Sequence, residues 1–221
     1  MREGGGVDDI EREKQVAAES AAALVEDGMV VGLGTGSTVA YLLPALGKRR
    51  LDISCVATSP ATESLARAEG LRVGPFESIE RLDLAIDGAD QVDPVGWLVK
   101  GGGGAHTREK IVAAAADRFI VIVSANKLVP KLDSPLPLEL MAFGLASVLR
   151  SLPEVALRQA PPSPDGGVLA DYHGPIDDPA QSARRFGATP GVVAHGLFPP
   201  SMVSLVLIGR GERVDSFQPP V

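Results

Sequence analysis

The sequence predicts an α/β protein: a Rossmann-like, mostly parallel sheet with helices on both faces, plus a smaller α+β domain. Two observations support this prediction. Short, almost wholly apolar segments, typical of strands buried on both faces, alternate with helical segments. The alternation is then interrupted at Pro135 and Pro137. We therefore expect an α/β main domain over residues 1–134 and 202–221, with a small α+β domain over residues 135–201 inserted before the last strand.

The elements of the main domain follow in order along the chain. Residues 1–7 are expected to form a flexible tail, and Asp8 with Glu11 resembles a capping box at the start of a helix that ends near Asp27. Apolar runs then predict strands at 29–33, 53–57, 71–73, 82–87, 97–101 and 119–125. Helical patterns between them predict helices at 37–46, 61–70 and 107–118.

The inserted segment has a different pattern. Its predicted elements are a helix, a strand, a second helix and a strand-like stretch, at 141–150, 168–172, 179–187 and 191–198, with a loop at 161–167. The apolar run over residues 202–209 is expected to rejoin the main sheet, and residues 212–221 are expected to follow without regular structure.

Composition and charge exclude several classes of function. The 221 residues are 45% hydrophobic, which is enough for a substantial core. The formal charge of −7 and the lack of a basic run argue against nucleic-acid partners and against an anionic membrane surface. Cys55 is the only cysteine, so no intramolecular disulfide can form. We expect a cytoplasmic protein, because no apolar segment reaches the roughly 18 residues that span a bilayer and the polar N-terminus is unlike a signal peptide.

The first candidate site is the segment GLGTGST at residues 32–38, which lies between a predicted strand and a predicted helix. Backbone N–H groups at a helix N-terminus bind anions. A dinucleotide fingerprint does not fit, because Ser37 stands where its final glycine is needed, and no G-K-[ST] follows as in an ATP-binding loop. The hydroxyls of Thr35, Ser37 and Thr38 suit a single small phosphate, with a purely structural turn as the alternative. Similar hydroxyls at residues 58–62 are more typical of helix capping.

The second candidate site is the acidic turn DGAD. Asp87 and Asp90 follow an apolar strand, at the edge where open α/β sheets bind ligands, and Gly88 allows a tight turn between them. Two carboxylates facing one cleft can accept hydrogen bonds from sugar hydroxyls; a solvated acidic turn is the alternative. A metal site would need further ligands, and the three histidines, His106, His173 and His195, have no metal-binding spacing.

The third candidate site is KGGGGAHTREK, residues 100–110. Consecutive glycines let the backbone approach a ligand closely and present N–H groups to it. Lys100 would supply positive charge to a phosphate or to a developing oxyanion. Thr107 is expected to cap the following helix, which places Glu109 in its first turn, facing the acidic pair. A carboxylate that only complements the helix dipole is the alternative for Glu109.

These segments, together with SANKLV and PLPLEL, resemble the type A ribose-5-phosphate isomerase family, and the resemblance covers nearly the whole chain. It implies interconversion of ribose 5-phosphate and ribulose 5-phosphate, in the non-oxidative pentose phosphate pathway, through an enediol intermediate. It further implies a small phosphorylated sugar as partner, no metal or organic cofactor, and a homodimer or homotetramer.

The resemblance also implies roles for individual residues. Glu109 matches the general base, and Asp87, Asp90 and Lys100 complete the implied catalytic set. The remaining residues implied to contact the substrate are Thr35, Gly36, Ser37, Thr38, Gly88, Ala89, Gly101, Gly102 and Gly103, with Lys127 and Lys14 near the phosphate. The chain departs from the family pattern at His106, where Leu is common, at Gln91, where Glu is frequent, and over the shorter segment 160–167.

Three rival functions use the same residues. Lys100 could be the Schiff-base nucleophile of an aldolase-like enzyme. A CoA-transferase-like enzyme could use Glu109 or Glu139 as acyl acceptor, although Glu139 is expected to anchor the domain junction. A sugar-phosphate sensor could bind without turnover, but we expect no room for a partner domain before Asp8 or after Arg213.

Overall fold

The computed structural model describes residues 6–77 and 79–220, so most of the predicted tail at residues 1–7 lies outside the described residues. A seven-stranded sheet runs in the order β14-β13-β7-β4-β1-β2-β3. All of its strands pair in parallel except β14, which is antiparallel to β13. The strands are β1 (Val30–Leu33), β2 (Ser54–Ala57), β3 (Arg72–Val73), β4 (Leu82–Asp87), β7 (Ala116–Ser124), β13 (Leu205–Arg210) and β14 (Arg213–Phe217). The predicted α/β fold class is confirmed.

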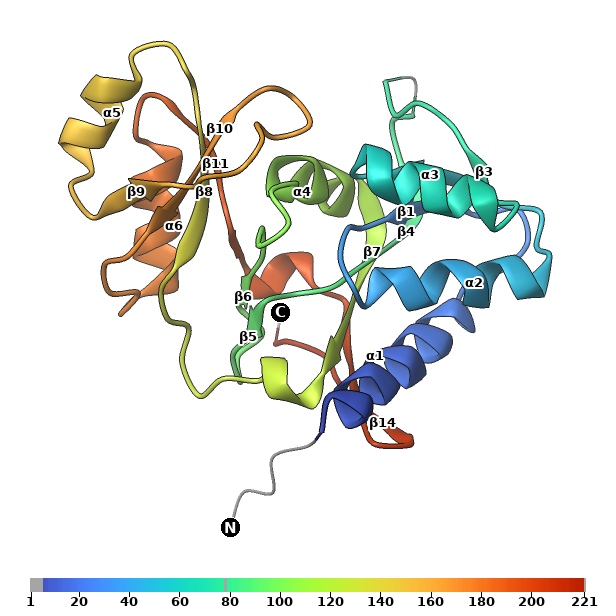
Figure 1. Ribbon diagram of the computed structural model, residues 1–221. Helices are drawn as coiled ribbons and strands as arrows, with labels where there is room; N and C mark the ends of the chain where they lie inside the picture. Colours follow the sequence, from blue (N-terminus) through green and yellow to red (C-terminus); the bar gives the residue numbers. More distant parts are fainter. Residues whose placement is uncertain (1–5, 78, 221) are drawn as a thin grey trace.

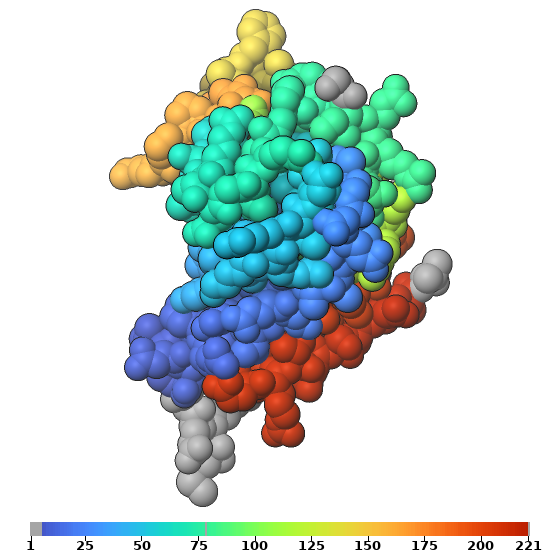
Figure 2. All heavy atoms as spheres, turned by 90° about the vertical axis from the view of Figure 1, so that its right-hand side faces the viewer, coloured from blue at the N-terminus to red at the C-terminus, as the bar shows by residue number. Residues whose placement is uncertain are grey.

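Helices cover both faces of this sheet. The helices are α1 (Val7–Ala22), α2 (Val39–Arg49), α3 (Pro60–Ala68) and α4 (His106–Ala114). Leu84 and Ile86 of β4 face a core shared with α1 and α2, whereas Ala85 faces a second core shared with α4. This alternation follows from the two-residue period of a strand. Figure 2 shows the first two helices, in blue, lying across one face beside the red C-terminal strands.

Two smaller sheets complete the molecule. An antiparallel sheet in the order β11-β8-β10-β9 encloses a third core, while α4 lies between it and the main sheet (Figure 1). Its strands are β8 (Leu136–Leu140), β9 (Val155–Leu157), β10 (Val168–Tyr172) and β11 (Val192–His195), with helices α5 (Leu145–Ser151) and α6 (Pro179–Gly187). A three-stranded sheet consists of β5 (Gln91–Val92), β6 (Leu98–Val99) and β12 (Leu197–Phe198). The 3₁₀ turns are η1 (Ala125–Lys127) and η2 (Pro200–Met202).

Several predicted boundaries in the main domain are wrong. The first helix begins at Val7, where the Gly6 N–H donates to the Asp9 carboxylate at 3.1 Å, and it ends well before Asp27. The helix predicted over residues 107–118 stops at Ala114. Ala116 instead begins β7, because it pairs with the first residue of β4. The segment after residue 212, expected to be irregular, forms β14 by returning along β13.

The small-domain predictions also need correction. Pro137 does not interrupt regular structure: it lies inside β8, and its carbonyl accepts from the Gly196 N–H at 2.7 Å. The helix predicted from residue 141 begins only at Leu145, because Gly144 adopts a φ of +73° outside the helical region. The stretch predicted at residues 191–198 divides into β11 and β12 on either side of Gly196. Among the described residues, no helix has the length and apolar character needed to cross a membrane.

Candidate active site

The three predicted loops meet in one small cleft of about 90 Å³ at the carboxyl end of the main sheet. They follow β1, β4 and β6, and η1 after β7 adds Lys127. The lining residues are Thr35, Gly36, Ser37, Thr38, Gly88, Ala89, Asp90, Lys100, Gly101, Gly102, Gly103, Glu109 and Lys127. Each of these had been singled out from the sequence.

The first loop fits closely against β4. The Gly34 N–H donates to the Ile86 carbonyl at 2.9 Å, and the Thr35 N–H donates to Asp87 Oδ1 at 3.1 Å. A Cβ on Gly34 would lie 1.9 Å from the carboxyl carbon of Asp87, so this close approach requires glycine. The first turn of α3 supports this loop, because Thr62 Oγ1 donates to the Gly34 carbonyl at 2.9 Å.

The junction at residues 58–62 therefore has two roles. Ser59 caps α3, accepting from the Thr62 N–H at 3.2 Å, as the sequence predicted. Sequence reasoning missed the second role, in which Thr58 and Thr62 hold the first loop. The Thr58 hydroxyl lies 2.7 Å from the Thr35 hydroxyl. The available signal was a set of hydroxyls directly after a buried strand, but the sequence does not say which loop they contact.

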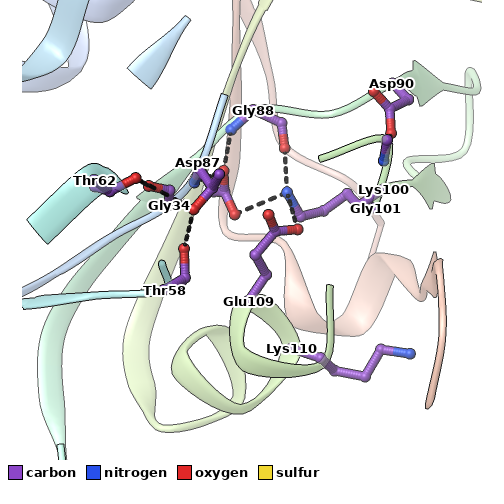
Figure 3. A network of polar contacts seen from close by, with 12 residues as sticks. Gly34, Thr58, Thr62, Asp87, Gly88, Asp90, Lys100, Gly101, Glu109 and Lys110 are labelled. Carbon is purple, nitrogen blue, oxygen red and sulfur yellow. Dashed lines mark hydrogen bonds and ion pairs between the residues drawn. The ribbon is translucent and has the colours of Figure 1, made fainter. Parts of the chain in front are cut away.

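Lys100 lies between two buried carboxylates (Figure 3). Its Nζ is 2.8 Å from Asp87 Oδ2 and 3.1 Å from Glu109 Oε2, and it also donates to the Gly88 carbonyl. Lys100 exposes 2% of its surface and Glu109 exposes 4%. β6 ends directly before Lys100, and α4 presents Glu109 from its first turn, so two separate elements position this pair.

Burial sets the protonation chemistry of the cluster. Burial and the negative charge of Asp87 raise the pKa of Glu109 to about 8, with Lys100 opposing the shift. For Lys100, burial alone would lower the pKa, but the charges of Asp87 and Glu109 outweigh it and raise the pKa above its usual value. Glu109 is thus suited to exchanging a proton near neutral pH. Lys100 stays a cation, which disfavours the Schiff-base alternative, since the nucleophile must be a neutral amine.

Asp87 and Asp90 have different environments. Asp87 does not line the cleft: Oδ1 accepts from the N–H groups of Thr35 and Gly88, and Oδ2 pairs with Lys100. Asp90 does line the cleft, and its Oδ2 accepts from the Gly102 N–H at 2.8 Å. Asp87 is therefore placed to fix the lysine and the first loop, whereas Asp90 is placed to meet a ligand.

One further prediction at this site, the helix cap, differs from the structure. Thr107 does not cap α4: the helix begins one residue earlier, and the Thr107 hydroxyl donates to Glu139. Lys14 is not among the lining residues, and its Nζ pairs with Glu11 at 2.6 Å. The Glu139 oxygens accept from Thr107 and from Ser163, so this carboxylate, outside the cleft, is already engaged at the domain junction.

The third loop needs its glycines. Gly101 and Gly104 have φ angles of +106° and +75°, which disfavour any other residue. A Cβ on Gly101 would lie 2.7 Å from Nδ1 of His106, which is fully buried beneath the loop. Burial and the nearby charge of Lys110 lower the pKa of His106 to about 4, so the ring stays neutral. His106 thus departs from the family pattern as a packing residue under the loop and does not line the cleft.

No group of three or more His, Cys, Asp or Glu side chains is arranged to hold a metal ion within residues 6–77 and 79–220. The expectation that the protein needs no cofactor stays a prediction.

Comparison with known proteins gives one consistent result. The family Ribose 5-phosphate isomerase A (phosphoriboisomerase A) matches residues 54–213. A ribose-5-phosphate isomerase A from Thermosynechococcus vestitus is 43% identical, and the match covers 92% of this chain and 93% of that protein. A crystal structure of ribose 5 phosphate isomerase A from Neisseria gonorrhoeae has a TM-score of 0.91 at 32% identity, covering 96% and 98% of the two chains. A D-ribose-5-phosphate isomerase solved in complex with phospho-erythronic acid has a TM-score of 0.89 at 33% identity, covering 95% and 99%.

Proposed function

We propose that this chain, which belongs to the ribose 5-phosphate isomerase A family, interconverts ribose 5-phosphate and ribulose 5-phosphate with Glu109 as the general base. The observation that supports this most directly is the Glu109 carboxylate itself. It lines the cleft, is almost fully buried, and lies 3.1 Å from a cation that can stabilise developing negative charge.

Aldose–ketose isomerisation moves one hydrogen between adjacent carbons. In our proposal, Glu109 removes the proton from C2 of the open-chain sugar, which gives an enediolate, and returns the proton to C1, while the hydroxyl proton of O2 passes to O1. Lys100 and the N–H groups of the glycine loop stabilise the charge on the enediolate oxygens. Asp90 accepts a hydrogen bond from a sugar hydroxyl. Asp87 does not contact the sugar and acts indirectly, by orienting Lys100.

We assign the phosphate of the sugar to the part of the cleft that the first loop lines. Thr35, Gly36, Ser37 and Thr38 line it just before α2, and their hydroxyls and N–H groups suit an anion. Lys127 adds a positive charge from η1. The relative in complex with phospho-erythronic acid, a phosphorylated sugar acid, supports this class of ligand. A role for Lys14 near the phosphate stays a prediction.

The decisive experiment replaces the base. Glu109→Gln keeps the size of the side chain but removes the proton acceptor, and a positioned general base contributes about 10²–10⁴-fold, or about 3–5 kcal/mol. We expect kcat for ribose 5-phosphate, measured with EDTA present, to fall by that factor while KM changes little. Glu139→Gln is the matched control, because it removes a buried carboxylate outside the cleft.

Two results would contradict the proposal. A Glu109→Gln variant with near-normal kcat would remove Glu109 from the mechanism. Failure of the unmodified protein to exchange the C2 hydrogen of the sugar in deuterated water would instead indicate a sensor that binds without turnover.

We also propose the domain division predicted from the sequence, with a main domain over residues 1–134 and 202–221 and a small domain over 135–201. The separate core of the four-stranded sheet supports it.

For the assembly we propose a homodimer or homotetramer. A groove of about 840 Å³ between α4 and the small domain contains exposed Ile111, Met141 and Phe143. A two-fold contact joins identical, self-complementary surfaces, and an exposed aromatic ring beside an apolar groove suits such a contact. The cytoplasmic location stays a prediction.

A further inference from the structure

We infer that Arg158, held in place by Asp171, is a positioning residue for the isomerisation: it fixes the orientation of the glycine loop from the small domain. The inference rests on the proposed function of the cleft. Arg158 does not line the cleft, and neither the sequence motifs nor the catalytic roles proposed above include it.

Arg158 contacts the loop through its carbonyl groups. Its Nη1 donates to the Gly101 carbonyl at 2.8 Å and lies 3.4 Å from the Gly102 carbonyl. The same guanidinium forms a two-point ion pair with Asp171, at 2.7 and 2.6 Å. Arg158 directly follows β9 and Asp171 lies on β10, so two paired strands fix the direction of the side chain.

The contact fixes one peptide plane from both sides. The Gly101 carbonyl and the Gly102 N–H belong to the same peptide unit, which is planar. Arg158 holds the carbonyl, and Asp90 accepts from the N–H at 2.8 Å. Two glycines in a row have little steric preference for any one orientation, so these polar contacts, together with the Gly104 N–H that donates to the Gly101 carbonyl at 3.0 Å, determine it.

The next peptide unit, between Gly102 and Gly103, also borders the cleft. Because C=O and N–H point in opposite directions in a trans peptide, a Gly102 carbonyl turned towards Arg158 turns the Gly103 N–H away from it. Gly103 lines the cleft, and its N–H donates to no acceptor in the part of the chain that the structure describes. The Arg158 contact therefore leaves one donor free to meet an oxygen of the sugar.

The surroundings suit an arginine in this role. The side chains of Arg158 and Asp171 expose only 16% and 19% of their surface, so the pair is largely shielded from solvent. Guanidinium is planar and can satisfy a carboxylate with one edge while another N–H reaches the loop, which a lysine cannot do. Leu169 of β10 touches the same loop, because a Cβ on Gly104 would lie 2.5 Å from its Cδ1. The small domain thus supports the loop at two points.

The test compares four variants with the unmodified protein. Arg158→Gln removes the contact, Arg158→Lys keeps only the charge, and the double variant R158D/D171R restores an ion pair with reversed polarity. Arg81→Gln is the matched control, because it breaks a two-point pair with Asp117 at the start of β4, far along the strand from the cleft. For each protein we would measure kcat, KM and Tm.

We expect Arg158→Gln to lower kcat about 10–100-fold, with a smaller change in KM, because displacing a loop that stabilises the transition state costs rate. Arg158→Lys should recover only part of this. The reversed pair should recover Tm but not kcat, because a carboxylate at position 158 repels the loop carbonyls. Arg81→Gln should leave kcat within about twofold.

Two outcomes would overturn the inference: a kcat for Arg158→Gln as high as that of Arg81→Gln, or recovery of kcat together with Tm in the reversed pair. If Arg158→Gln does not fold, Arg158→Lys decides, and a normal kcat there overturns the inference. These results differ from failure of the proposed function, in which the unmodified protein itself would not turn over ribose 5-phosphate.

Discussion

At the scale of single residues, the site depends on one lysine shared by two carboxylates. Two negative groups this close would repel each other in a buried site, and the Nζ of Lys100 between Asp87 and Glu109 offsets that repulsion. Removing one member of a buried charge cluster leaves an unpaired charge, which typically costs about 3–5 kcal/mol. The cluster therefore combines the proposed catalytic groups with a constraint on folding.

The pH dependence of activity should report on this cluster. In the proposed mechanism Glu109 must be ionised to act as the base. Because the pKa of Glu109 is raised to about 8, kcat/KM should fall as pH drops below that value. Asp87 contributes to the raised pKa, so Asp87→Asn should move this rise to lower pH. Profiles of kcat/KM between about pH 5 and 10, for the unmodified protein and for Asp87→Asn, would measure this shift.

Asp215→Asn, on exposed β14, controls for the loss of a negative charge elsewhere. An Asp87→Asn profile that stays in place, or moves to higher pH, would show that Asp87 does not set the pKa of the base.

Most of the lining residues could be predicted from sequence because they lie in loops that directly follow apolar strands. The position of Asp87 could not, since sequence places Asp87 and Asp90 in one turn but does not show that one faces inwards to Lys100. Arg158 was missed for a similar reason. Its partners are backbone carbonyls 56 and 57 residues away, and no motif records such a contact.

At the scale of elements, the three strand-end loops are placed by close backbone packing. Apolar runs made the strands of the main sheet predictable. Boundaries failed where tertiary pairing decided them: Ala116 is in an alanine-rich, helix-favouring segment, but pairing with β4 draws it into β7. Likewise, β8 contains Pro137 because its register with β10 and β11 overrides local preference.

Gly34→Ala tests the packing of the first loop against β4. The added methyl group would meet the Asp87 carboxylate, which cannot retreat because Lys100 and two N–H groups hold it. We expect a loss of about 1–3 kcal/mol in the free energy of unfolding, from urea titration, together with at least a tenfold lower kcat.

Gly74→Ala is the control, because a Cβ there meets nothing within 4 Å and its φ is not positive. If Gly34→Ala were as stable and active as this control, the loop would be more adaptable than its contacts indicate.

At the scale of the whole molecule, the fold class followed from the alternation of elements, whereas the proposed domain division rests on the change of pattern near residue 135. The surface proposed for the contact between copies could not be predicted in this way, because the fold decides which apolar side chains stay exposed. Phe143, in a segment that sequence assigned to a helix, instead lies ahead of α5 with 89% of its surface exposed.

Phe143→Ser tests the proposed assembly. Losing the protruding ring should weaken the contact between copies, so light scattering after size exclusion should give a smaller mass than for the unmodified protein. The thermal unfolding of the separated subunits should change little, because an exposed ring contributes little to the core.

Val95→Ser is the matched control, since Val95 is exposed but does not line the groove. An unchanged mass for Phe143→Ser, or a monomeric unmodified protein, would contradict the proposal.

The position of β13 has a consequence for how the protein is made. This strand lies between β7 and β14 in the main sheet, and α1 packs against it. The Glu13 carbonyl of α1 leaves no room for a side chain at Gly209. While the ribosome is still translating residues 125–204, the edge of β7 that later pairs with β13 has no partner strand. The helix α1 then lacks part of the surface against which it packs. The main sheet can close only after residues 205–217 have left the exit tunnel, so its folding is completed after that of the segments that precede β13.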